Sequence, residues 1–263
     1  MALQLYPPHL QAVGMFDGGK IVEQKPIGFP GEGSAVKRVG PLFYWAWFEG
    51  KEDGFIPFHP HKGFEIITYF LAGKGGHKDS LGTESTVEAG GAQVMQTGSG
   101  AYHAETMYKG SSGFQIWFEP YMGDAVQRQP TYVQHEHEEF PAVVEAGVTV
   151  KTVLGSTSPI ELVADAQLWD VTLEAGATFT TQVPAGYSLA GLVVEGDTEW
   201  NAAGALESTR VEHRVFAVYR AETATEVSVQ APDGQSARVI FIQTPSELPY
   251  LPYNRVREFY TNS

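Results

Sequence analysis

Short segments of β-forming residues, each closed by glycine or a polar turn, recur along the chain. The sequence has 29 glycines and 16 prolines among 263 residues, which favours many short strands joined by tight turns. Apolar residues alternate or form brief runs, as in ITYFL before Gly73 and in AQLWDVTLEAG, YSLAGLVVEG and ARVIFIQ. Helical periodicity is confined to LPYNRVREFY near the C-terminus. The pattern predicts an all-β protein with a short helical tail.

The length of the chain allows two domains, each with its own core. A second β-rich region, from about 145 to 245, repeats the alternation of apolar strands and glycine-rich turns that the first half shows. This repetition indicates a duplication. We expect one domain at 1–134, a linker at 135–144 and a second domain at 145–263.

The charge of the chain limits its partners. It carries 17 Lys and Arg against 31 Asp and Glu, a net charge of −14, whereas nucleic-acid binding relies on basic side chains that neutralise phosphates. Direct nucleic-acid binding is therefore disfavoured. The sequence has no apolar run of about 18 residues, and its start, MALQLYPPHL, lacks the regions of a signal peptide, so we expect a cytoplasmic protein that does not enter a membrane.

Two pairs of metal-binding residue types stand at i, i+2 spacing, His59-Pro60-His61 and His103-Ala104-Glu105. On a strand, i and i+2 side chains share a face roughly 6.5 to 7 Å apart, so two such pairs on neighbouring strands would bring four ligands together. Three imidazoles and a carboxylate suit Fe, Mn, Ni, Cu or Zn. Pro60 lacks an N–H group, which predicts an edge strand, a strand start or a bulge for the first pair.

A His-x-His pair alone is weak evidence, because 8 histidines in 263 residues give roughly a quarter of such a pair by chance. A second pair, His135 and His137, lies in the polar run VQHEHEEFP without strand periodicity, and we interpret it as part of the linker. Context strengthens the first pair, which precedes ITYFL, and the pair at 103 and 105, which follows a glycine-rich stretch.

The segments HPHKGFE, HKDSLG and QVMQTGSGAYHAE, in this order, resemble the pirin family of the cupin superfamily, and the resemblance spans roughly residues 15 to 140. It implies two tandem jelly-roll β-barrels, each of six to eight strands in a closed or double-sheet architecture, the second without a metal site. It also implies one metal ion held by His59, His61, His103 and Glu105. The expected ion is a divalent first-row metal, Fe(II) first, with Mn, Ni, Cu or Zn as alternatives.

Two further residues of these motifs are interpreted separately. Glu65 occupies the position of a ligand in the broader cupin pattern, but the resemblance to pirins implies a structural carboxylate or one that orients a histidine. His77, in GGHKDSLG, is expected in a turn whose chemistry comes from Asp79, Ser80 and Gly82.

The resemblance implies two functions. The first is an iron-dependent dioxygenase of quercetin 2,3-dioxygenase type, with a small flavonol-like aromatic and dioxygen as substrates and Glu105 as both ligand and catalytic base. The alternative is a non-enzymatic, metal- or redox-dependent regulator that contacts a protein partner, such as a transcription factor or a metabolic enzyme. A pocket beside the metal that is wide enough for a bicyclic aromatic would favour the enzyme.

Overall fold

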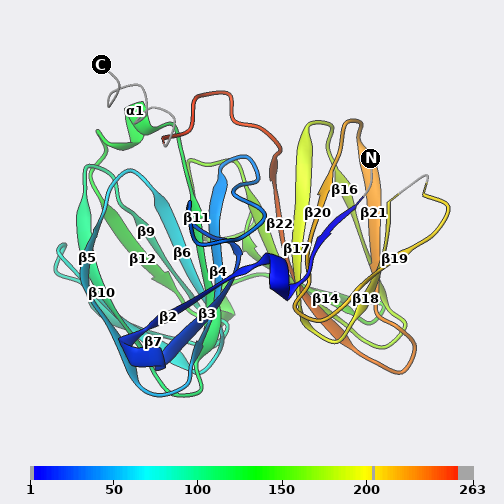
Figure 1. The fold of residues 1–263 in the computed structure, drawn as a ribbon, viewed down its shortest axis with the longest axis horizontal. Helices are drawn as coiled ribbons and strands as arrows, with labels where there is room; N and C mark the ends of the chain where they lie inside the picture. The colour runs from blue at the N-terminus through cyan, green and yellow to red at the C-terminus, as the bar shows by residue number, and fades with distance from the viewer. Residues whose placement is uncertain (1–2, 203–204, 254–263) are drawn as a thin grey trace. The chain divides into compact units, whose positions relative to one another are not determined.

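The computed structural model describes residues 3–202 and 205–253 and contains two compact units (Figure 1). Each unit pairs a seven-stranded antiparallel sheet with a four-stranded one. The expected all-β fold with two jelly rolls in tandem is confirmed. Of the closed and double-sheet forms expected, each unit has the double-sheet form within the described residues. The expected number of strands was wrong, since each unit has more than six to eight.

The N-terminal unit comprises Ala12–Glu139 and Leu162–Ala164, with the chain from Leu248 on. Its larger sheet has the order β12-β9-β6-β11-β4-β3-β2. These strands are β2 (Ala12–Phe16), β3 (Ile21–Ile27), β4 (Leu42–Gly50), β6 (Glu65–Ala72), β9 (Ala92–Gln96), β11 (Ser112–Phe118) and β12 (Thr131–His135). The smaller sheet has the order β5-β10-β7-β8, with β5 (Gly54–His61), β7 (Lys74–Asp79), β8 (Glu84–Glu88) and β10 (Ala101–Met107).

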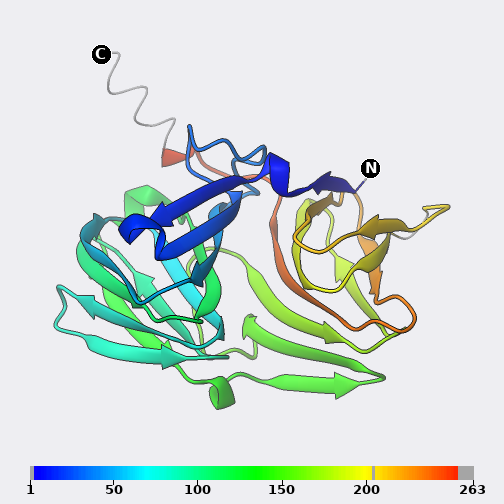
Figure 2. The same cartoon turned by 60° about the horizontal axis from the view of Figure 1, so that its bottom comes forward.

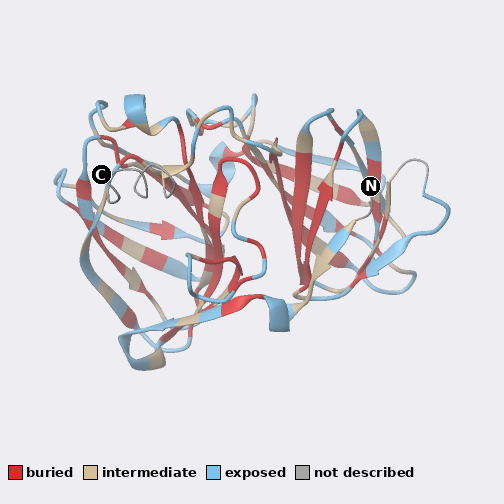
Figure 3. Cartoon of the chain, turned by 45° about the horizontal axis from the view of Figure 1, so that its top comes forward, coloured by how far each residue is buried: buried red, intermediate tan, exposed pale blue. Residues whose placement is uncertain are grey.

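Apolar side chains from both sheets pack inside the N-terminal unit. Figure 3, coloured by burial, shows buried residues along many of the strands. The alternation expected of a strand with one buried face is visible in β7, whereas β6 is buried at six consecutive positions. One cluster joins Ile21, Phe48 and Phe70 of the larger sheet to Val87 and Met107 of the smaller one. The core thus holds the two sheets together and fixes which side chains point between them.

The C-terminal unit comprises Phe140–Glu161 and Asp165–Glu247, with the residues up to Gln11. Its larger sheet has the order β1-β20-β17-β22-β15-β14-β13 and its smaller sheet β16-β21-β18-β19. The strands of the larger sheet are β1 (Gln4–Tyr6), β13 (Ala142–Glu145), β14 (Val148–Leu154), β15 (Gln167–Leu173), β17 (Tyr187–Glu195), β20 (Phe216–Arg220) and β22 (Ala237–Pro245). Those of the smaller sheet are β16 (Thr178–Val183), β18 (Thr198–Ala202), β19 (Thr209–Val211) and β21 (Thr225–Gln230).

Helical structure in the described residues is short: α1 (Met122–Ala125), and the 3-10 turns η1 (Pro8–Leu10), η2 (Asp17–Gly19) and η3 (His137–Glu139). None of these helices is long and apolar enough to span a bilayer. Most of LPYNRVREFY, where a helical tail is expected, lies outside the described residues. The segment 135–144, expected as a linker, contains the last residue of β12, the turn η3 and the start of β13. A second view of the fold, in Figure 2, shows the hairpin of β2 and β3 in blue.

Candidate metal centre

Strands β5 and β10 place three histidines side by side. In the antiparallel pairing, His103 lies opposite His59 and Ala101 lies opposite His61. His59, His61 and His103 therefore share the inner face of the four-stranded sheet. β5 is the edge strand of this sheet, as the proline within the dyad predicts.

A β-bulge in β5 sets this alignment. Between two pairs of facing residues, β10 runs two residues, from Glu105 to His103, while β5 runs three, from Ile56 to His59. The extra residue in the Pro57–Phe58 step reverses which side chains of β5 point inward. Without the bulge, side chains would alternate regularly along β5, and with Ile56 pointing inward His59 and His61 would point outward.

The imidazole nitrogens converge closely enough to bind one ion. One ligand atom from each of His59, His61 and His103 lies within 4.8 Å of the others, and Nε2 of His61 lies 2.9 Å from Nε2 of His103. Nδ1 of His59 lies 2.8 Å from the Pro57 carbonyl oxygen and donates to it, which leaves Nε2 as the ligand atom. The donor set fits a divalent first-row metal.

Burial keeps the rings of His61 and His103 in the neutral form that metal ions require. Desolvation, with a smaller contribution from neighbouring histidines, lowers the pKa of His61 and of His103 to about 3. Both rings are therefore unprotonated at neutral pH, and a cation entering the site displaces no proton from them.

Glu105 lies one row further along β10, opposite Ile56 and His77. Its carboxylate is buried and accepts hydrogen bonds from Gln115 Nε2 at 3.0 Å to each oxygen. Trp117 Nε1 donates to the Gln115 amide oxygen at 3.2 Å, which fixes the orientation of that amide. Burial raises the pKa of Glu105, opposed by His59 and by the hydrogen bonds from Gln115. The histidine group forms without Glu105, whose role as fourth ligand stays a prediction.

The expectation for His77 was wrong, because this residue lies in β7 and is buried. Its Nε2 lies 3.0 Å from Oδ2 of Asp79, and its ring stacks on Tyr132 at 4.2 Å between centroids. Asp79 supplies the turn chemistry, since its Oδ1 accepts the N–H groups of Leu81 and Thr83. The alternation in KGGHKD, where lysines face out and His77 and Asp79 face in, is the period-two signal that identifies the strand.

Glu65, at the start of β6, is a structural carboxylate. It accepts hydrogen bonds from Gln96 Nε2 at 2.6 Å and from the N–H groups of Val163 at 2.7 Å and Ala164 at 2.9 Å. These contacts tie residues 162–164 to β6 and include no histidine.

The pair at His135 and His137 lies at the end of β12 and in the turn η3. His135 ends β12, where it pairs with Ala92, and its Nδ1 lies 3.0 Å from Oε1 of Glu139. His137 begins η3. Within the described residues, the one group of three ligand-type side chains that could hold a metal does not include either of them.

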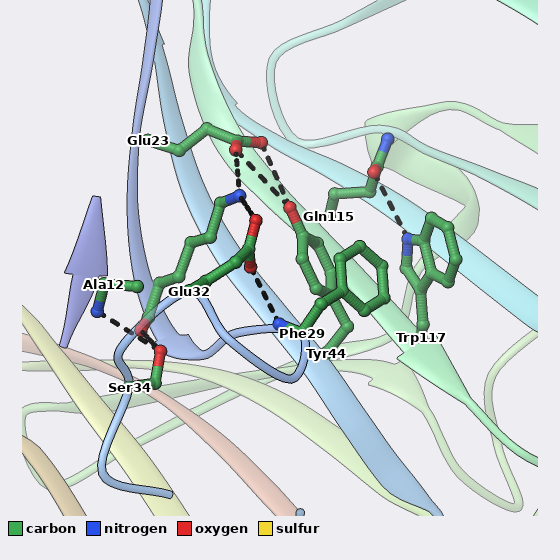
Figure 4. A network of polar contacts seen from close by, with 9 residues as sticks. Ala12, Glu23, Phe29, Glu32, Ser34, Tyr44, Gln115 and Trp117 are labelled. Carbon is green, nitrogen blue, oxygen red and sulfur yellow. Dashed lines mark hydrogen bonds and ion pairs between the residues drawn. The ribbon is translucent and has the colours of Figure 1, made fainter. Parts of the chain in front are cut away.

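A cavity of about 420 Å³ lies between the two sheets of the N-terminal unit and adjoins the histidines. Its volume is that of a typical small-molecule site. Figure 4 shows part of its polar lining, including Glu23, Tyr44 and Gln115. The lining residues are Phe16, Glu23, Phe29, Tyr44, Ile56, Pro57, Phe58, His59, His61, Glu105, Gln115 and Trp117.

Comparison of the sequence with protein families gives a match to pirin over residues 46–118, a span that includes all four predicted ligands. A pirin-like protein of Arabidopsis thaliana is 30% identical over 196 residues, which covers 73% of this chain and 70% of that protein. A pirin-like protein of Caulobacter vibrioides is 37% identical over 140 residues, 49% of this chain and 50% of that protein. The chain thus matches about half the length of the second relative.

Solved structures share the fold along nearly the whole chain. A bacterial pirin, YhhW of Escherichia coli in complex with nickel(II), superposes with a TM-score of 0.75 at 21% identity, covering 93% of this chain and 99% of that one. A quercetin 2,3-dioxygenase of Acinetobacter baumannii gives a TM-score of 0.77 at 17% identity, covering 99% of this chain and 88% of that one. At these identities the likeness is one of fold.

Proposed function

The chain belongs to the pirin family of the cupin superfamily, and from this premise we propose that it is a metal-dependent dioxygenase of the quercetin 2,3-dioxygenase type. The observation that carries the proposal is the cavity of about 420 Å³ with His59, His61 and Glu105 in its wall. A site of this size suits a bicyclic aromatic placed beside the ion. A metal sealed from solvent would have favoured a regulatory role.

In this proposal, His59, His61 and His103 hold one divalent ion, with Glu105 as the fourth ligand. The ion is Fe(II) in the first place, and Mn, Ni, Cu or Zn are alternatives that the same donors accept. When bound, the ion supplies Lewis acidity that favours a deprotonated flavonol and a route for reaction with dioxygen. The net reaction adds both atoms of dioxygen to the flavonol and releases one carbon monoxide, so no external reductant is needed.

The protein's own contribution begins with proton removal. Glu105 accepts the proton of the flavonol 3-hydroxyl, a task that suits a buried carboxylate because burial raises its pKa and makes it a stronger base. Gln115 donates to both carboxylate oxygens and thereby holds the base in place. Loss of the charge-assisted bonds from Gln115 would free Glu105 to rotate away from the substrate.

Aromatic side chains shape the rest of the cavity for a flat ligand. The rings of Phe29 and Tyr44 stack at 4.4 Å between centroids, and Trp117 meets Phe29 edge-on at 5.2 Å. Trp117 also packs edge-on against His61 at 4.6 Å, which restricts rotation of that ring. These walls exclude water from the bound aromatic and orient it toward the histidines.

The net charge of −14 argues against nucleic acid as a partner, and the proposal places the protein in the cytoplasm with a small-molecule substrate. If the protein is instead a regulator, we propose a protein partner with a basic surface. The opposite charges of the two proteins would then set the rate of association.

The test is an assay of iron-loaded protein with quercetin in air, following loss of the flavonol absorbance and release of carbon monoxide. We expect turnover well above that of free iron, and we expect His103→Ala to abolish the excess. If the parent and His103→Ala both behave like free iron, the enzyme proposal is wrong and the regulator remains.

A further inference from the structure

The cavity has a second polar wall, built on the sheet that does not carry the histidines. Glu23, on β3, is 8% exposed and lines the cavity together with the hydroxyl-bearing Tyr44 of β4. The metal-binding histidines come from β5 and β10 of the other sheet. A ligand between the sheets therefore meets a nitrogen-rich wall on one side and a carboxylate on the other.

The Glu23 carboxylate has acceptor capacity to spare (Figure 4). Lys25 Nζ lies 2.7 Å from Oε1 of Glu32 and 3.2 Å from Oε2 of Glu23, so one ammonium serves two carboxylates. The other Glu23 oxygen, Oε1, has the Tyr44 hydroxyl at 3.4 Å, a long contact for O–H···O. An ionised carboxylate accepts about four hydrogen bonds, and Glu23 is one of the residues that line the cavity.

Glu23 lines the same cavity as His59, His61 and Glu105. Burial raises the pKa of Glu23, Lys25 opposes that rise, and the charge of Glu105 adds to it. The backbone of Gly14 lies close to the carboxylate, since a Cβ built on Gly14 would lie 2.7 Å from Oε2 of Glu23. The contacts of the Glu23 carboxylate compensate the cost of burying its charge only in part. A hydrogen-bond donor of a ligand inside the cavity would compensate it further.

We propose that Glu23 is a specificity residue that accepts a hydrogen bond from a ring hydroxyl of the aromatic substrate, at a position remote from the 3-hydroxyl and 4-keto groups. The inference rests on the proposed flavonol site and assigns its substrate class: polyhydroxylated, not bare, flavonols. The competing explanation is that Glu23 serves solely as a counter-ion for Lys25, in which case the hydroxylation of the ligand makes no difference.

The experiment measures dissociation constants with zinc-loaded protein, because zinc binds the same donors and does not support redox turnover. The two probes are quercetin and 3-hydroxyflavone, which has the same 3-hydroxy-4-keto group and no other hydroxyl. For the parent we expect quercetin to bind at least about tenfold more tightly, as for one hydrogen bond to a buried charge. Glu23→Gln should reduce this ratio to below about threefold by weakening quercetin binding alone.

Glu32→Gln is the matched control, since Glu32 contacts the same ammonium but does not line the cavity. It should keep the parent ratio. Glu23→Asp gives a second variant if Glu23→Gln fails to fold, because it keeps the charge beside Lys25 and withdraws the oxygens by one methylene; it should also lose the preference. Zinc content and thermal unfolding report folding of each variant.

The outcomes separate the two proposals. A parent ratio near one, or an unchanged ratio in Glu23→Gln and Glu23→Asp, overturns the role of Glu23 even if the iron form turns over quercetin. A ratio that depends on Glu23 without any turnover supports the role of Glu23 and refutes the dioxygenase. Binding of neither flavonol by the parent overturns both. The ratio of each variant is compared with that of the parent, so general differences in affinity between the two flavonols cancel.

Discussion

Replacing Glu65 by glutamine tests whether this carboxylate acts on the fold or on the metal. Its oxygens accept three hydrogen bonds, two of them from the backbone N–H groups of Val163 and Ala164. Glutamine offers one acceptor oxygen and one NH2 group, so at least one buried N–H would face another donor. Losing a hydrogen bond to a buried charge costs about 1.5–3 kcal/mol, and an unsatisfied donor costs a similar amount. We expect Glu65→Gln to lower the free energy of unfolding by about 2–4 kcal/mol.

The assay is urea unfolding followed by tryptophan fluorescence, with zinc content measured in parallel. Glu84→Gln is the control, because Glu84 lies on β8 with its side chain 75% exposed and pairs with Lys78 on the surface. It should change stability by less than about 0.5 kcal/mol. If the Glu65→Gln variant is as stable as this control, the reasoning is refuted. If the variant is stable but no longer binds zinc, Glu65 acts on the metal and not on the fold.

Two other perturbations address the metal centre. Gln115→Leu removes both donors to Glu105 and should weaken zinc binding roughly 10–100-fold in competition with a chelator, whereas unchanged affinity would argue against Glu105 as a ligand. In metal-free protein, His61 and His103 have a pKa of about 3, against about 6.5 in an unfolded chain, so stability falls as the pH drops from about 6.5 towards 3. At pH 5 the loss should reach up to about 2 kcal/mol per histidine by urea unfolding, and His61→Asn should show a shallower pH dependence than the parent.

Local sequence predicts the strands of this fold better than their arrangement. The run ITYFL and the glycine that closes it correspond to β6, and Gly73 adopts φ 66° where a Cβ would lie 2.7 Å from the Ser111 backbone. The pairing of β6 with β9 and β11, and the split of each unit into seven and four strands, depend on contacts between residues far apart in the chain. No local pattern encodes such contacts.

For the site too, local sequence predicts some features, whereas others depend on contacts between distant residues. The dyads at 59 and 103 are visible because ligand-type residues at i, i+2 share one strand face, and the histidines do converge. The bulge that makes this convergence possible has no comparable signal. Glu23, Tyr44 and Gln115 were not predicted, because each stands alone in a strand and becomes part of the site when two sheets pack.

Comparison of the two smaller sheets shows what distinguishes the unit with the histidine group from the other unit, within the described residues. The order β16-β21-β18-β19 corresponds to β5-β10-β7-β8, so β21 takes the place of β10. At the inward positions of β21 stand Val227 and Val229, both fully buried among apolar residues, where β10 has His103 and Glu105. Dispersion and burial stabilise the valines of β21. The buried polar side chains of β10, in contrast, need a cation or a ligand to compensate the cost of their burial. The same jelly-roll frame therefore supports a packed core or a cavity lined by polar side chains, depending on a few inward side chains of one strand.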